Sequence, residues 1–322
     1  MKTLFAKDVL LASDWHQDVS IEIDDKGFIR KVTENHPCEV GAQRLTGPTI
    51  PGMPNVHSHV WQRGFAGRTE VRGDFWAWRN IMYRHAQGFD PEDLYAIAAQ
   101  TYRDMLKAGY TWVGEFHYLH HTPNGSPYDN PAEMSEQVIQ AALDVGIGIT
   151  LLPVLYGYSN FGSQPAEPGQ QRFVHDAGGF LRLLDTLHSK YANNPRVRIG
   201  CAPHSLRAVD PDLLVDVLAN AVGPKHIHIA EQPREVADCV DWCGKRPVEW
   251  LMENIAIDAS WCLIHATHVS VLELENMAAS GAVVGLCPTT EANLGDGVFS
   301  AERFLQLGGN FAIGSDSQVS VD

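Results

Sequence analysis

The fold is decided from residue 49 onward, where the sequence reads TIPGMPNVHSH (49–59). From here on, short apolar and β-branched runs alternate with helix-like segments, which is typical of βα units around a parallel sheet in an α/β protein. The later runs are TWVGEF (111–116), GITLLPVLY (148–156), VRIGCAPH (197–204), HIHIAE (226–231), SWCLIHA (260–266), GAVVGLCP (281–288) and NFAIGSD (310–316). Eight runs favour a (β/α)8 TIM-type barrel over an open sheet. The absence of a GxGxxG after the first run also weakens a dinucleotide-binding fold.

The segments around these runs support the same organisation. The clearest helix begins with Asp90 as N-cap and Pro91 at its first position, and it ends at Gly109. Residues 1–48 alternate loosely, and Asp24–Gly27 is typical of a hairpin turn between two short strands. We therefore expect a small N-terminal β unit over 1–48 and a barrel over 49–322.

Composition excludes several classes of protein. No apolar run reaches the roughly 18 residues that a membrane span needs, and the N-terminus lacks the continuous apolar core of a signal peptide. Six scattered cysteines do not form a disulfide framework. A net charge of −15 argues against nucleic acid or an anionic membrane as a partner. We expect a mature cytoplasmic protein.

Histidines close the first run. His57 and His59 are two residues apart, so on a strand both side chains point to the same side and can reach one point. Two polar residues on a solvent-facing edge would give the same pattern.

Three other runs also end in polar residues. His228 and Glu231 close the fifth run, where His226 is a competing ligand on the same face, and His265 ends the sixth. Asp316 ends the eighth, although an aspartate there could also cap a following helix. In barrels the carboxyl ends of the strands converge on the active site. Imidazoles and a carboxylate are zinc ligands, and bound zinc lowers the pKa of water to about 7, which leaves a nearby carboxylate and imidazole to move protons.

The motifs PGMPNVHSH, HIHIAE, LIHATH and GSDS, in this order, resemble the amidohydrolase superfamily in its deaminase branch. The resemblance covers the chain from about residue 50. It implies one metal ion, held by His57, His59, His228 and Asp316. Asp316 would accept a proton from the attacking water, Glu231 would protonate the substrate nitrogen, and His265 would orient or polarise the nucleophile. Family members with two metal ions have a carboxylated lysine that bridges the ions at the end of the fourth strand. The fourth run here ends in Ala202-Pro203-His204, so the resemblance implies one metal ion and not two.

Further segments of the same resemblance narrow the substrate: HSHVWQRGFAG, DFWAWR, GYTWVGEFHYLHH, HSLRAV and CPTTEANLGDGVF. They imply hydrolysis of N-formimino-L-glutamate to N-formyl-L-glutamate and ammonia, as in histidine degradation. Arg79 and Arg207 could each bind a carboxylate of this substrate, and Gln62, Tyr118 and His204 could add hydrogen bonds.

Other interpretations stay open. A deaminase of nucleobases or S-adenosylhomocysteine would have an apolar or aromatic pocket in place of two arginines, and a metal-free binding homologue would have lost ligands. Family members suggest a homodimer, and divalent ions other than Zn²⁺ could bind. The family pattern also includes an eighth helix and C-terminal strands that complete a β-sandwich with residues 1–48, so we expect the barrel over 49–322 to lack its C-terminal portion.

Overall fold

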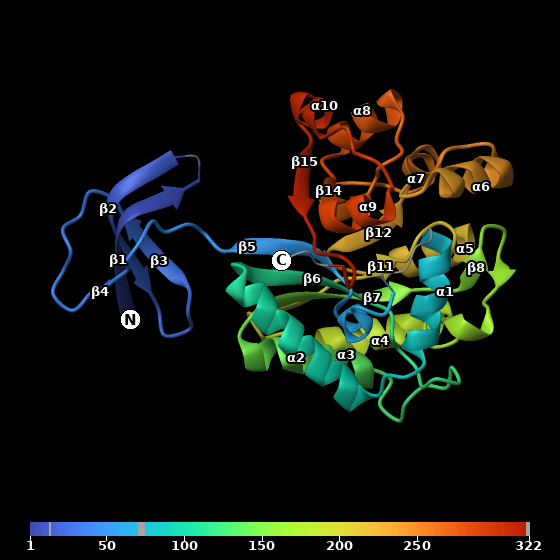
Figure 1. Cartoon of the computed structure of the whole chain (residues 1–322), viewed down its shortest axis with the longest axis horizontal. Helices are drawn as coiled ribbons and strands as arrows, with labels where there is room; N and C mark the ends of the chain where they lie inside the picture. The colour runs from blue at the N-terminus through green and yellow to red at the C-terminus, as the bar shows by residue number, and fades with distance from the viewer. Residues whose placement is uncertain (13, 70–74, 320–322) are drawn as a thin grey trace. The chain divides into compact units, whose positions relative to one another are not determined.

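The computed structural model describes residues 1–12, 14–69 and 75–319. The chain divides into two compact units, Met1–Met53 and Pro54–Asp322. Each unit has its own cluster of buried apolar side chains. Figure 1 shows the helices and strands of both units.

The first unit is a four-stranded sheet with the order β3-β2-β1-β4. Its strands are β1 (Lys2–Leu11), β2 (Asp14–Ile23), β3 (Ile29–Thr33) and β4 (Gln43–Arg44). The hairpin between β2 and β3 turns where the sequence predicted it, because the Asp24 carboxylate accepts from the backbone N–H groups of Lys26 and Phe28, each at 2.9 Å. Gly27 takes the positive φ of 86° that this turn needs.

The second unit contains the eight predicted strands. They are β5 (Met53–Ser58), β6 (Tyr110–His117), β7 (Gly148–Leu155), β10 (Val197–Ile199) with β11 (Ala202–Pro203), β12 (Lys225–Ile229), β13 (Trp261–His265), β14 (Val283–Leu286) and β15 (Asn310–Ile313). They form two parallel sheets, β10-β7-β6-β5 with β11 on β7, and β12-β13-β14-β15. Parallel bridges Ser58↔Asp316 and Cys201↔Lys225 join the two sheets at both edges. The predicted (β/α)8 barrel is thereby confirmed.

Helices and short elements connect the strands. The helices are α1 (Phe75–Ala86), α2 (Pro91–Lys107), α3 (Glu133–Val145), α4 (Ala177–Tyr191), α5 (Pro211–Leu218), α6 (Pro233–Cys243), α7 (Pro247–Asn254), α8 (Val271–Ser280), α9 (Pro288–Leu294) and α10 (Ala301–Gln306). The shorter elements are η1 (Val60–Phe65), β8 (Tyr158–Asn160), β9 (Gln164–Pro165) and η2 (Pro168–Gln170). Helix α2 begins as predicted, with the Asp90 carboxylate accepting from the Asp93 N–H at 2.8 Å in a capping box.

Close backbone approach inside the barrel requires glycine at one strand position. A Cβ on Gly114 of β6 would lie 2.4 Å from the carbonyl oxygen of Val56 on the neighbouring β5, and 3.5 Å from the ring of His226. Gly114 therefore lets the two strands approach and leaves room for the His226 imidazole.

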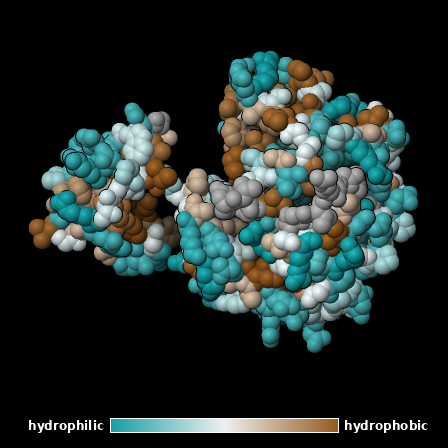
Figure 2. Space-filling view, in the orientation of Figure 1, coloured by the Kyte–Doolittle hydropathy of each residue, from teal (hydrophilic) through white to brown (hydrophobic). Residues whose placement is uncertain are grey.

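Burial differs between the strands of the second sheet. Every residue of β13 is buried, whereas β15 exposes Phe311 and Ile313 by 38% each. Figure 2 shows hydrophobic side chains gathered along β15. None of the helices in the part of the chain that the structure describes is long and apolar enough to cross a bilayer.

Candidate metal centre and active site

The two histidines at the end of β5 face the same point. His57 and His59 are buried, with 0% and 4% of their surface exposed, and their Nε2 atoms lie 3.2 Å apart. His59 donates from Nδ1 to the carbonyl oxygen of Phe116 on β6 at 2.9 Å, which fixes its ring orientation. Strand alternation therefore brings the pair together as the sequence predicted.

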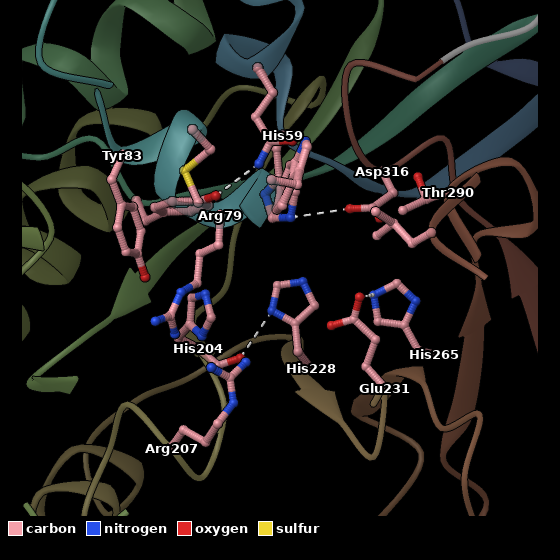
Figure 3. A pocket seen from close by; sticks show the side chains of 15 residues that line it. His59, Arg79, Tyr83, His204, Arg207, His228, Glu231, His265, Thr290 and Asp316 are labelled. Atoms are coloured by element: carbon pink, nitrogen blue, oxygen red, sulfur yellow. Dashed lines mark hydrogen bonds and ion pairs between the residues drawn. The ribbon is translucent and has the colours of Figure 1, made fainter. Parts of the chain in front are cut away.

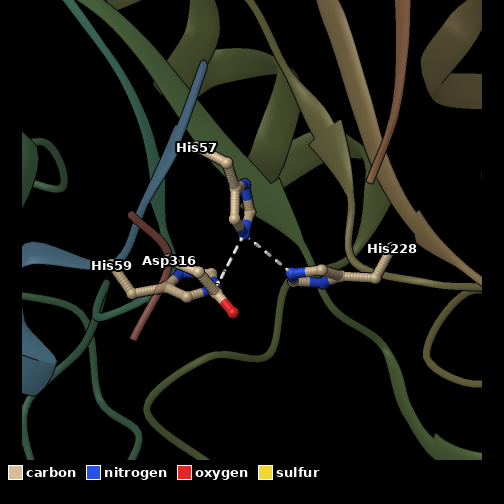
Figure 4. A group of neighbouring side chains, drawn as sticks. All are labelled: His57, His59, His228 and Asp316. Atoms are coloured by element: carbon tan, nitrogen blue, oxygen red, sulfur yellow. Dashed lines mark hydrogen bonds and ion pairs between the residues drawn. The ribbon is translucent and has the colours of Figure 1, made fainter. Parts of the chain in front are cut away.

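His228 on β12 and Asp316 after β15 complete this group (Figure 4). His228 Nε2 lies 3.1 Å from His57 Nε2, and Asp316 Oδ1 lies 3.2 Å and 3.3 Å from the Nε2 atoms of His57 and His59. The four ligand atoms all lie within 4.8 Å of one another. We call these four residues the metal cluster.

The donor chemistry of the metal cluster fits a divalent cation. His59 and His228 each face a backbone carbonyl with Nδ1, at 2.9 Å and 3.1 Å, so each carries its proton there and directs the Nε2 lone pair at the cluster. Burial lowers the pKa of His57 to about 4, so this imidazole is neutral at neutral pH. Converging lone pairs and a carboxylate repel one another unless a cation lies among them. Three imidazoles with one carboxylate are a common ligand set for such an ion.

The competing ligands do not join this cluster. His226 lies on the same strand as His228, but its ring sits beside Gly114, deeper in the barrel. A second possible group combines His265 and Cys287 with the same Asp316. Burial raises the pKa of the Cys287 thiol well above its usual range, so the thiol keeps its proton and is a poor ligand.

Backbone strain concentrates at the strand ends that carry these side chains. Ala230 after β12, His265 and Ala266 at the end of β13, and Asp316 after β15 have φ values of 51°, 67°, 49° and 58°. Non-glycine residues rarely adopt this left-handed conformation, and it recurs at functional sites. At each of these positions the left-handed conformation turns the backbone where the side chain enters the site.

Buried polar side chains support the ligands from behind. Asn55 on β5 accepts from the backbone N–H groups of His57 at 3.2 Å and Ser315 at 3.0 Å, and it donates to the Ser315 hydroxyl at 2.7 Å. It thus ties the first barrel strand to the segment that presents Asp316. Glu115 on β6 accepts from the N–H of Val60 at 2.7 Å and so fixes the backbone that follows His59.

We predict that Asn55→Ala weakens metal binding by about 10- to 100-fold, because the orientation of Asp316 relative to β5 is no longer fixed. The unsatisfied backbone groups should also lower the free energy of unfolding by about 2 kcal/mol. Competition with a chelating dye and chemical denaturation measure the two effects. Asn124→Ala, at an exposed loop asparagine, is the control, and equal metal affinity in both variants would contradict this role.

A carboxyl and an imidazole lie beside the metal cluster without belonging to it. Glu231 Oε1 is 3.8 Å from His265 Nε2, and the other ring nitrogen of His265 is 3.2 Å from Glu291 Oε1. Burial raises the pKa of Glu231 to about 8, against the opposing charge of His265. Burial lowers the pKa of His265, but the carboxylates around it, Glu231 first, outweigh this and raise it.

One cavity opens onto these groups. In Figure 3, Glu231, His265 and Asp316 lie on one side of it, Arg79, His204 and Arg207 lie on the other, and His228 lies between. All five residues predicted to bind substrate line this cavity: Gln62, Arg79, Tyr118, His204 and Arg207. Gln62 donates to the Tyr118 hydroxyl at 2.9 Å, while its own carbonyl oxygen is buried and has no hydrogen-bond partner among the described residues.

Several residues of the site were not among those predicted from the sequence. Glu291 on α9 contacts His265, and Glu235 on α6 accepts from the backbone N–H groups of Ala230 and Glu231, each at 3.1 Å. Tyr83 on α1 lines the cavity one helical turn after Arg79. For Tyr83, the four-residue spacing from Arg79 was a usable signal.

Comparisons with known proteins agree with the motif pattern. The model of the amidohydrolase family matches residues 49–322. A formimidoylglutamate deiminase of Pseudomonas aeruginosa is 49% identical, with 100% of this chain and 72% of that protein aligned. A 5-methylthioadenosine/S-adenosylhomocysteine deaminase of Natronomonas pharaonis is 28% identical over 84% of this chain and 58% of its own length. The crystal structure of an amidohydrolase from Brucella melitensis superposes with a TM-score of 0.94 at 46% identity, covering 100% of this chain and 72% of that one.

Proposed function

This chain belongs to the amidohydrolase family, and on that premise we propose that it hydrolyses N-formimino-L-glutamate to N-formyl-L-glutamate and ammonia. It is a hydrolase of carbon–nitrogen bonds other than peptide bonds, and its place would be in histidine degradation. The observation that carries the substrate assignment is the pair of arginines, Arg79 and Arg207, in the cavity that also contains the metal cluster and Glu231. A substrate with two carboxylates requires such cationic donors in an otherwise acidic protein.

The reaction divides among side chains already described. A divalent cation held by the metal cluster would activate a water molecule for attack on the formimino carbon. Asp316 would accept a proton from the attacking water, and Glu231, whose pKa burial raises, would donate a proton to the departing nitrogen. His265, held by Glu291, orients the attacking water, and the free carbonyl oxygen of Gln62 accepts from an N–H of the substrate.

Three finer assignments belong to this proposal. The cation is Zn²⁺, one per chain, because three imidazoles and a carboxylate suit its preferences. The protein acts as a homodimer, and it acts in the cytoplasm on a small-molecule substrate.

A purine-type deaminase is the competing activity, since several more distant relatives carry such names. The base of such a substrate would have to stack in the cavity without using the two guanidinium groups. Ammonia release by purified, zinc-loaded protein from a substrate panel separates the cases. Turnover of a purine or pyrimidine, with none of N-formimino-L-glutamate, would overturn the proposal.

We predict that Arg207→Ala raises KM for N-formimino-L-glutamate by about 10- to 100-fold, because a charged hydrogen-bonding partner of a carboxylate is lost. Arg207→Lys should recover only part of the loss, since it keeps the charge but not the forked donor geometry. Arg196→Ala removes an exposed arginine and is the control. An unchanged KM in Arg207→Ala would exclude a carboxylate contact at this position.

A further inference from the structure

Helix α1 forms one wall of the cavity. Trp78, Arg79, Met82 and Tyr83 all line it, since residues three and four apart share a helix face. The Arg79 guanidinium carbon lies 5.5 Å from the centre of the Tyr83 ring. Tyr83 is 8% exposed, and the proposed reaction leaves its hydroxyl without a role.

A buried amide behind Tyr83 fixes the direction of the local hydrogen bonds. The Gln170 carbonyl oxygen accepts from the backbone N–H of Glu167 at 2.7 Å, so the amide nitrogen must face the other way. That nitrogen donates to the hydroxyl oxygens of Tyr83 at 3.0 Å and Tyr156 at 2.8 Å. Both hydrogens of the amide are used, and both phenols act as acceptors.

The two phenol hydroxyls together have two hydrogens to donate, but only one of these hydrogens can be used in the bond between them. Their oxygens are 3.2 Å apart, so one O–H can donate to the other phenol and the second hydrogen needs another acceptor. Tyr156 is 2% exposed and is not part of the cavity lining, and among the described residues its hydroxyl forms hydrogen bonds only with Tyr83 and Gln170. Both hydroxyl hydrogens have an acceptor only if Tyr156 donates to Tyr83 and Tyr83 donates to a group in the cavity.

We propose that the Tyr83 hydroxyl donates a hydrogen bond to the γ-carboxylate of the substrate, next to Arg79, and so selects a dicarboxylate of this length. This rests on the proposed function. Tyr83 and Arg79 lie across the cavity from Glu231, His265 and Asp316, so they reach the carboxylate farther from the reacting carbon (Figure 3). An anion is the acceptor that this position favours, because the neighbouring cavity groups Arg79 and Arg207 are cationic donors.

The test compares wild-type protein, Tyr83→Phe and Tyr156→Phe, all loaded with Zn²⁺, on two substrates. These are N-formimino-L-glutamate and N-formimino-L-2-aminobutyrate, which lacks only the γ-carboxylate. With the first substrate we expect Tyr83→Phe to raise KM about tenfold or more while kcat stays within about twofold. With the second, kcat/KM should differ from wild type by no more than about twofold.

Tyr156→Phe is the matched control, because it removes the partner phenol but leaves the Tyr83 hydroxyl bonded to Gln170. We expect it to lower the melting temperature and to leave KM within about twofold. A similar rise of KM in both variants would show that the hydroxyl pair only positions α1, and an unchanged KM in Tyr83→Phe would exclude the contact. A loss that persists with the 2-aminobutyrate substrate would overturn the γ-carboxylate assignment. Wild-type protein inactive on N-formimino-L-glutamate would instead overturn the proposed function.

Discussion

Asp316→Asn is expected to lower ammonia release by about three orders of magnitude or more, and to weaken metal binding in the same protein. Asp316 is the carboxylate of the metal cluster, with Oδ1 3.2 Å from His57 Nε2. Burial opposes its ionisation, but the neighbouring imidazoles of His57 and His59 outweigh this and hold the pKa of Asp316 well below its usual range. Asparagine has nearly the same shape, yet it carries no charge for a cation and cannot take a proton from water.

Steady-state ammonia release and metal content after dialysis measure the two effects. Asp185→Asn, at an exposed position of α4, is the matched control and should change neither. Turnover close to wild type in Asp316→Asn would remove this residue from both of its assigned roles.

Glu231→Gln should lower kcat by about 10²- to 10⁴-fold while metal content stays at the wild-type level. Glu231 lies beside the metal cluster without belonging to it, and its raised pKa of about 8 keeps a proton available for the departing nitrogen. Glutamine preserves the hydrogen-bonding shape but cannot transfer that proton. The contrast with Asp316→Asn therefore separates proton transfer from metal binding.

The same two measurements apply to this variant, with Glu275→Gln on the exposed face of α8 as the control. Loss of metal together with activity would mean that Glu231 supports the cluster and is not the proton donor. Full activity would exclude it from the reaction.

The barrel and its strand ends could be predicted from the sequence, because the apolar runs that alternate with helix-like segments are the strands buried inside the barrel. The carboxyl ends of all the strands lie at the same end of the barrel. The side chains that follow them therefore come together there, and these include His57, His59, His228 and Asp316. The choice between His226 and His228 stayed open because both share one face of β12. It was decided by depth in the barrel, where His226 fits against Gly114.

The helical part of the site was harder to predict. Tyr83 and Glu291 lie on α1 and α9, and the position of a helix relative to the strand ends depends on packing that a single sequence does not display. The direction of the Tyr83 hydroxyl depends further on Gln170 and Tyr156, which come from segments more than 70 residues away. The positive φ of Asp316 had no signal in the sequence either, since aspartate gives no sign of the strain that it carries.

The most direct measurement is a Zn²⁺ titration of metal-stripped protein, with ammonia release from N-formimino-L-glutamate followed at each step. We predict no release without metal, and a rise that stops at one equivalent per chain, because the metal cluster offers one set of four ligands. Release by the metal-free protein, or no release at any metal concentration, would contradict a metal-dependent deiminase.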